Sequence, residues 1–133
     1  MTPSVYRLSL DIHGVDSQGM LPVKAGDTAR AISFTLRQKG VPNEVPSNCQ
    51  AVLTARKADG NILLDPCRVE AGGIYYAFTS QMTAVPGEVL CELRLYGAYG
   101  KLLTCPRFSV LVSEQVVGDN EVVESSSEFP ALT

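Results

Sequence analysis

Residues 89–96 read Val-Leu-Cys-Glu-Leu-Arg-Leu-Tyr, and this stretch decides the fold class. Apolar residues recur at every second position from Val89 to Leu95, with Glu92 and Arg94 between them. Successive side chains of a strand point to opposite faces, so this alternation predicts a β-strand with one buried face. Pro86 and Gly87 directly before it predict a turn.

The same alternation recurs along the chain, with no sustained helical period before residue 113. It is clearest in residues 6–12, 31–37 and 108–112, and further short strands are expected at residues 20–23, 51–57, 62–64, 67–70, 74–79 and 101–104. We therefore predict an all-β fold, an antiparallel two-sheet β-sandwich of about seven or eight strands. A closed barrel is the other way for strands alone to bury one another's faces.

The composition changes after Val112. Residues 113–128 hold five acidic residues and four serines. We expect a β-sandwich domain over residues 1–112 and an acidic, Ser-rich linker over residues 113–133. This linker leads to a truncated helix start, in which Ser127 is placed to cap the first turn and Pro130 is tolerated.

The charge balance argues against two classes of partner. With a formal net charge of −3 and scattered lysines and arginines, the 133-residue chain lacks the basic stripe that binding to nucleic acid requires. No stretch is long and apolar enough to predict insertion into a membrane, and residues 1–7 do not read as a signal peptide. We expect synthesis in a cytoplasm.

The four cysteines, Cys49, Cys67, Cys91 and Cys105, are spread singly, without a Cys-x-x-Cys pair. This spacing is unlike that of a zinc site or a redox dithiol. We expect reduced thiols that act as small, partly buried apolar residues. Disulfides in an assembled extracellular particle remain the alternative, and their pairing does not follow from the sequence.

The residues do not predict a catalytic, metal or cofactor site, so we do not expect an enzyme. His13 is the one histidine, and a base or metal ligand there would have to rely on Asp11 or Asp16. A solvated loop histidine is the simpler interpretation. No serine lies in a Gly-x-Ser-x-Gly elbow, and a catalytic triad would have to use this same histidine.

Four tyrosines form the candidate interaction surface: Tyr75, Tyr76, Tyr96 and Tyr99. Adjacent tyrosines on a strand point to opposite faces, and a tyrosine in a turn is expected to be exposed. Exposed tyrosines stack on sugar rings or anchor protein interfaces, so a carbohydrate-binding module is the competing function. The alternative is that one tyrosine of each pair belongs to the core.

The order of several short segments resembles the N-terminal domain of phage baseplate upper proteins, which are tail-tip components of phages and prophages of Gram-positive bacteria. The segments are residues 6–11, 23–28, 31–37, 40–42, 54–60, 87–95, 108–112 and 124–132. Each segment alone is common, whereas the ordered set is moderately specific and covers nearly the whole chain.

This resemblance implies a structural protein of the virion tail tip. Its members have a β-sandwich that docks on the central tail hub, then a helical linker and a distal domain that carries receptor-binding proteins. Partners would be other tail and baseplate proteins, in a homo-oligomeric assembly. The cysteines and the loop from Pro42 to Pro46 depart from the pattern, so the docking surface does not transfer residue by residue.

Overall fold

The computed structural model describes residues 4–15, 20–42, 48–70, 73–97 and 101–116, and within these ranges it contains strands and no helix. The strands are β1 (Ser4–Asp11), β2 (Met20–Lys24), β3 (Arg30–Gln38), β4 (Val41–Pro42), β5 (Gln50–Arg56), β6 (Ile62–Glu70), β7 (Gly73–Ala77), β8 (Gly87–Tyr96), β9 (Leu102–Thr104) and β10 (Phe108–Ser113). The all-β prediction is confirmed. The described part has ten strands, more than the predicted seven or eight; β4 was not expected as a strand, whereas β9 falls within the strand expected at residues 101–104.

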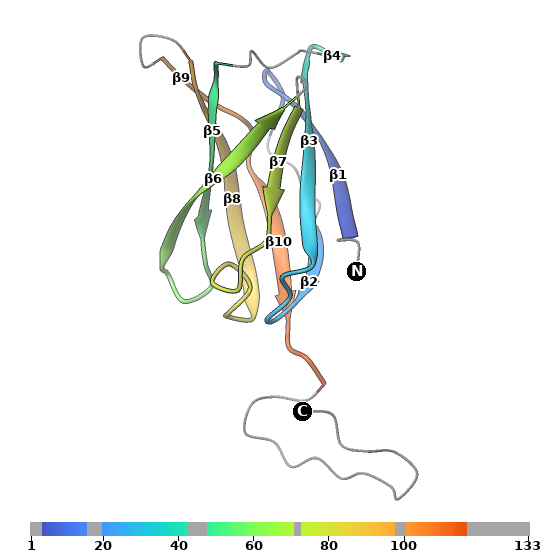
Figure 1. Cartoon of the computed structure of the whole chain (residues 1–133), viewed down its shortest axis with the longest axis vertical. Coiled ribbons are helices and arrows are strands. Elements are labelled where there is room, and N and C mark those ends of the chain that lie inside the picture. Colours follow the sequence, from blue (N-terminus) through green and yellow to red (C-terminus); the bar gives the residue numbers. More distant parts are fainter. Residues whose placement is uncertain (1–3, 16–19, 43–47, 71–72, 98–100, 117–133) are drawn as a thin grey trace, which may run out of the picture.

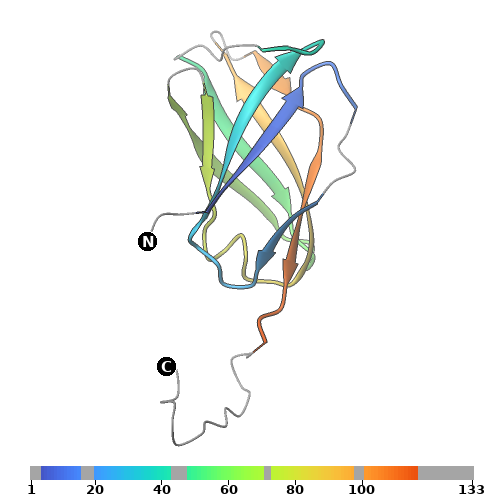
Figure 2. The same ribbon diagram turned by 90° about the vertical axis from the view of Figure 1, so that its right-hand side faces the viewer.

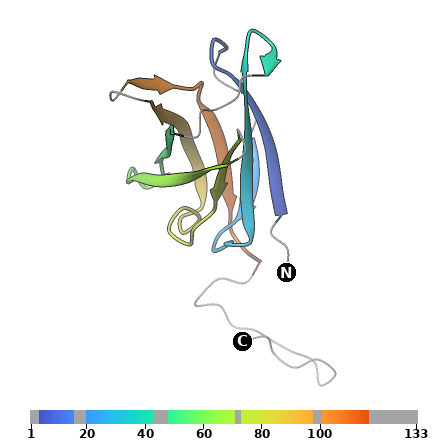
Figure 3. The same ribbon diagram turned by 45° about the horizontal axis from the view of Figure 1, so that its top comes forward.

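The strands follow one continuous path, in the order β1-β3-β7-β6-β5-β8-β10-β2, with β4 on β3 and β9 on β8. Figure 3 shows them arranged around a common interior, as in a barrel. The prediction of purely antiparallel pairing was wrong at both ends of the path, because β1 pairs with β3 and β2 pairs with β10 in parallel. A hairpin turn cannot join two parallel strands. Accordingly, at least one other strand lies in the chain between β1 and β3, and between β2 and β10.

Strand β6 joins the two layers of the barrel. Its first part, Ile62 to Cys67, pairs with β5, and its last part, Arg68 to Glu70, pairs with β7. We call the layer of β1, β3 and β7 sheet A, and the layer of β5, β8, β10 and β2 sheet B. Strand β6 belongs to both layers. The sequence analysis predicted two strands, at residues 62–64 and 67–70, and in the structure both are parts of β6 (Figure 1).

Side chains join the two ends of the path. The Tyr6 hydroxyl on β1 donates a hydrogen bond to the Pro22 carbonyl oxygen on β2. Arg30 donates to the same hydroxyl at 2.9 Å and forms an ion pair of 2.8 Å with Asp27. We call these four residues the seam. Figure 2 shows β1 crossing this side of the molecule and β2 beside β10.

The core lies between the layers and is closed at one end by the segment between β7 and β8. Phe34 of β3 and Phe108 of β10 meet edge to face across the interior, with ring centroids 5.6 Å apart. Met82 and Thr83 are fully buried, and the Thr83 hydroxyl donates to the Asp27 carbonyl oxygen at 2.9 Å. Such large, interlocked side chains supply most of the free energy that stabilises a barrel of this size.

Strand β1 begins and β10 ends at the same end of the barrel, opposite β4 and β9 (Figure 1). Strand β10 ends at Ser113, so it passes the predicted domain boundary by one residue. The predicted helix start near Ser127 lies outside the described residues. Within the described part, no helix is long and apolar enough to cross a membrane.

Candidate functional site

Tyr75 lies on the outer face of sheet A, in a shallow hollow of about 610 Å³. The hollow also includes Arg7 of β1, Ser33 of β3 and Arg68 of β6. The Arg68 guanidinium lies over the Tyr75 ring, 5.3 Å from its centroid, and Arg68 also pairs with Glu70 at 3.1 Å. A cation over the ring holds the tyrosine against the sheet and occupies one of its faces.

Tyr76, the next residue, points the other way into the core and is 1% exposed. Its hydroxyl donates a hydrogen bond of 2.6 Å to the Asp65 carboxylate. Burial, and then this carboxylate, raise the pKa of Tyr76 above its ordinary value. Tyr76 is therefore unavailable at the surface of the folded domain.

The remaining two tyrosines do not join Tyr75. Tyr96 is half-buried at the end of β8, where it is paired with Gln50 and Leu102 in sheet B. Tyr99 lies outside the described residues. Tyr75 and Tyr96 thus stand on the outer sides of different layers, and the described tyrosines do not form one platform.

The loop at His13 is organised by the Asp11 carboxylate. Asp11 accepts hydrogen bonds from the backbone N–H groups of His13 at 2.9 Å, Lys39 at 3.2 Å and Gly40 at 3.0 Å. The bond from His13 is the main cause that lowers the pKa of Asp11. Asp11 therefore ties the end of β1 to the turn between β3 and β4. Within the described residues, no three His, Cys, Asp or Glu side chains gather to hold a metal ion.

All four cysteines are free thiols, and Cys91 and Cys105 are buried. Burial raises the pKa of Cys67 to about 12, of Cys91 to about 12 and of Cys105 to about 11. It also raises the pKa of the half-buried Cys49. A nucleophilic cysteine needs a lowered pKa, so these thiols pack as apolar groups.

Arginines on the outer faces were missed by the sequence reasoning. Arg7 and Arg68 line the hollow on sheet A, and Arg56 and Arg94 line a second hollow on sheet B. Arg7, Arg68 and Arg94 each stand between apolar residues of a strand, and this position is the signal that places them outside. Which of them come together depends on strand order, and periodicity carries no information on that order.

Comparison with known proteins identifies a family for the whole domain. The family model described as "BppU N-terminal domain" matches residues 6–133. Among solved structures, the chain resembles the "N-terminal domain of phage TP901-1 ORF48" with a TM-score of 0.66 and 12% identity, over 82% of this chain and 98% of that chain. It also matches CopC from Methylosinus trichosporium OB3b with a TM-score of 0.46 and 10% identity, over 75% and 91% of the two chains. That score is too low to carry an argument.

The search of curated proteins gave no match. At 12% identity, the likeness to the phage structure shows a shared fold alone. The family model, in contrast, spans every described strand from Tyr6 onward. The chain therefore belongs to the BppU N-terminal domain family, the N-terminal domains of the structural baseplate upper proteins of phages.

Proposed function

We propose that this domain docks on the tail hub of a phage or prophage baseplate and leads to the receptor-binding parts of the tail tip. The observation that carries the proposal is the family match over residues 6–133. The architecture is compatible with this role, because its outer faces present arginines, tyrosine and exposed leucines. Arginine and tyrosine are enriched at protein interfaces.

The proposal includes a homo-oligomeric assembly at the virion tail tip, after synthesis in the host cytoplasm. Strand β10 ends at one end of the barrel (Figure 1), and the receptor-binding parts would extend from that end. The sides of the barrel would then be available to neighbouring baseplate proteins. Mechanical assembly needs complementary surfaces and no reacting groups, which agrees with the raised pKa values of the thiols.

Co-expression with the tail hub protein of the same phage or prophage tests the proposal. The full-length protein should elute with the hub protein in size-exclusion chromatography, with a light-scattering mass of more than one copy. The hub protein of an unrelated phage serves as the control and should elute separately. If the two proteins elute separately at micromolar concentration, the docking proposal is contradicted.

Carbohydrate binding is the second candidate, and the observation that favours it is the position of Tyr75 in a surface hollow. A sugar ring can stack on an aromatic ring in such a hollow, and on Tyr75 it would use the face that Arg68 leaves open or displace the Arg68 guanidinium. A glycan array should then retain the protein, and the Tyr75→Ala variant should lose binding while Tyr96→Ala keeps it. Absence of binding to any glycan removes this candidate.

A further inference from the structure

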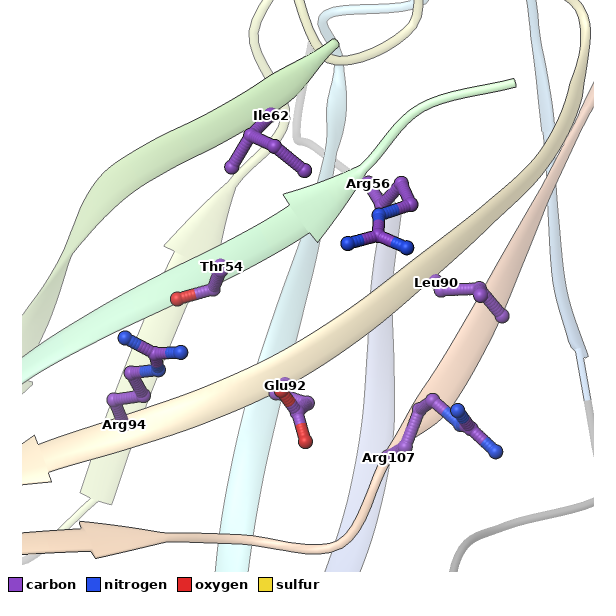
Figure 4. A pocket seen from close by; sticks show the side chains of 7 residues that line it. All are labelled: Thr54, Arg56, Ile62, Leu90, Glu92, Arg94 and Arg107. Atoms are coloured by element: carbon purple, nitrogen blue, oxygen red, sulfur yellow. The ribbon is translucent and has the colours of Figure 1, made fainter. Parts of the chain in front are cut away.

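The outer face of sheet B has a hollow of about 380 Å³ in which three arginines meet one glutamate. Arg56 comes from β5, Glu92 and Arg94 from β8, and Arg107 from the segment before β10 (Figure 4). Thr54, Ile62 and Leu90 complete its lining. We call this site the arginine hollow.

Two polar atoms in the arginine hollow are buried without a partner. They are the Thr54 hydroxyl oxygen and the Arg94 Nε, and they are the two such side-chain atoms found in the described part of the chain. Thr54 pairs with Glu92 and Val52 pairs with Arg94, so Thr54 and Arg94 are diagonal neighbours on one face. Figure 4 shows the Arg94 guanidinium reaching toward Thr54.

The Arg94 Nε–H is a hydrogen-bond donor only, and the Thr54 hydroxyl can donate as well as accept, so one acceptor group can satisfy both. A buried donor without an acceptor is unfavourable, so an acceptor placed here would be stabilised by the hydrogen bond that it receives. An arginine Nε–H and its neighbouring N–H groups match the two oxygens of a carboxylate, and the Thr54 hydroxyl can donate to the same group.

The charge of the arginine hollow is opposite to that of the chain. Three arginines and one glutamate give a local balance of +2, whereas the whole chain has a formal net charge of −3. All three cations are arginines, the side chain that recognises carboxylates with two hydrogen bonds and loses less hydration than lysine when covered. A negative partner is therefore attracted to this face, whereas the scattered lysines and arginines of the chain do not form the basic stripe that a long nucleic acid needs.

Apolar side chains on the same face indicate a protein as the partner. Ile62 at the edge of the hollow is 54% exposed, and Leu64, which pairs with Thr54, is 62% exposed. Leu111 on β10 is also exposed. Exposed aliphatic residues around arginines are typical of the rim and core of a protein interface.

We propose that the arginine hollow binds an aspartate or glutamate side chain of an acidic, partly apolar segment of a neighbouring tail protein. The carboxylate accepts hydrogen bonds from Arg94 and Thr54, Arg56 adds a second positive charge, and apolar residues beside the carboxylate pack on Ile62 and Leu64. The inference rests on the proposed function for the identity of the partner as a tail protein. The carboxylate chemistry follows from the hollow alone.

A peptide array tests the carboxylate chemistry of the hollow separately from the identity of the partner protein. Overlapping peptides from the tail proteins of the same phage or prophage are probed with the full-length protein at low and high salt. Retained peptides should contain Asp or Glu next to apolar residues, and replacing that acid by Asn or Gln should abolish retention. Retention of basic peptides, or no difference between acid and amide, would overturn the inference.

Variants of the hollow test the same contact in affinity measurements. Arg94→Lys keeps the positive charge and removes the bidentate hydrogen-bonding geometry. Arg56→Gln removes a positive charge at a more exposed position. Each substitution should lower the affinity for the retained peptide or tail protein by about tenfold or more. The matched control is Arg68→Gln, an arginine on the outer face of sheet A, which should change the affinity less than about twofold.

The outcomes distinguish the two proposals. If a tail protein binds and the Arg94 and Arg56 variants bind it equally well, the arginine hollow is not the contact, although the proposed function stands. If no full-length tail protein binds but an acidic peptide binds in an Arg94-dependent way, the proposed docking fails and the hollow's chemistry stands. If neither binds, both proposals fail.

Discussion

The Tyr76 hydroxyl donates a hydrogen bond of 2.6 Å to the Asp65 carboxylate, and this bond links β7 to the strand that joins the two layers. Asp65 stands at an inward-facing position of β6, between Leu63 and Cys67. A carboxylate aimed toward a core needs a donor, and Tyr76 supplies it.

Tyr76→Phe should therefore destabilise the domain by about 1–2 kcal/mol, because the hydrogen bond to a charged acceptor is lost while the ring remains packed. Tyr75→Phe is the matched control and should change the free energy of unfolding by less than about 0.5 kcal/mol, since Tyr75 lies on the outer face. Urea denaturation measures both. Equal effects of the two substitutions would contradict the assignment of Tyr76 to the core.

Gly87→Ala should destabilise the domain more than Gly60→Ala. Both glycines have positive φ, 128° and 87°, so both substitutions strain the backbone by about 1–2 kcal/mol. A Cβ at Gly87 would also lie 2.5 Å from the Ala58 Cβ, whereas a Cβ at Gly60 meets no atom within 4 Å. Midpoints of chemical denaturation check this order, and a Gly60→Ala variant as unstable as Gly87→Ala would disprove the close packing.

The free energy of unfolding should fall at alkaline pH. The thiols of Cys67, Cys91 and Cys105 have an ordinary pKa of 9.0 and ionise in the folded domain only near pH 11–12. Their contribution is complete below pH 9 and is lost as the pH rises toward the folded values, because the unfolded chain releases these protons first. Tyr76, with its raised pKa, acts in the same direction above pH 10.

Urea titrations between pH 7 and pH 11 measure this dependence. Cys91→Ala lowers stability at every pH by opening a cavity, and it should also make the decline above pH 9 shallower by up to about 1.4 kcal/mol per pH unit. Cys49→Ala, at a half-buried thiol, should alter this slope less. A decline that is the same in all three proteins would show that Cys91 does not titrate as described.

Tyr6→Phe should loosen the seam between β1 and β2. The substitution removes the hydroxyl that donates to Pro22 and accepts from Arg30. Amide hydrogen exchange in β2 should become faster, since in the described part of the chain β10 is the one strand with which β2 pairs. Tyr96→Phe serves as the control, with exchange in β2 unchanged. Unchanged exchange in Tyr6→Phe would mean that the seam does not close the barrel.

The sequence predicted the strands better than their arrangement. The period of two in residues 89–96 and 31–37 is a local signal, so β8 and β3 were predicted nearly to the residue. Parallel pairing of β1 with β3 and of β2 with β10 depends on long-range order. The same is true of Met82, which fills the core from a segment without any period.

The candidate surface was less predictable for a related reason. Alternation separates Tyr75 from Tyr76, but it does not say which of the two faces the core. In the structure Tyr76 does, with the buried Ile74 and Phe78 on the same face and with the Asp65 carboxylate accepting the hydrogen bond of its hydroxyl. Likewise, Arg56 and Arg94 are far apart in sequence and line the same hollow only because β5 and β8 are neighbours.

Electron cryomicroscopy of purified tails from the phage or induced prophage that encodes this chain tests the central claim most directly. The account predicts density for this barrel at the tail tip, with an outer face of the barrel packed against another baseplate protein. Purified, infectious particles that lack the protein by mass spectrometry, or tail tips without this barrel, would contradict the account.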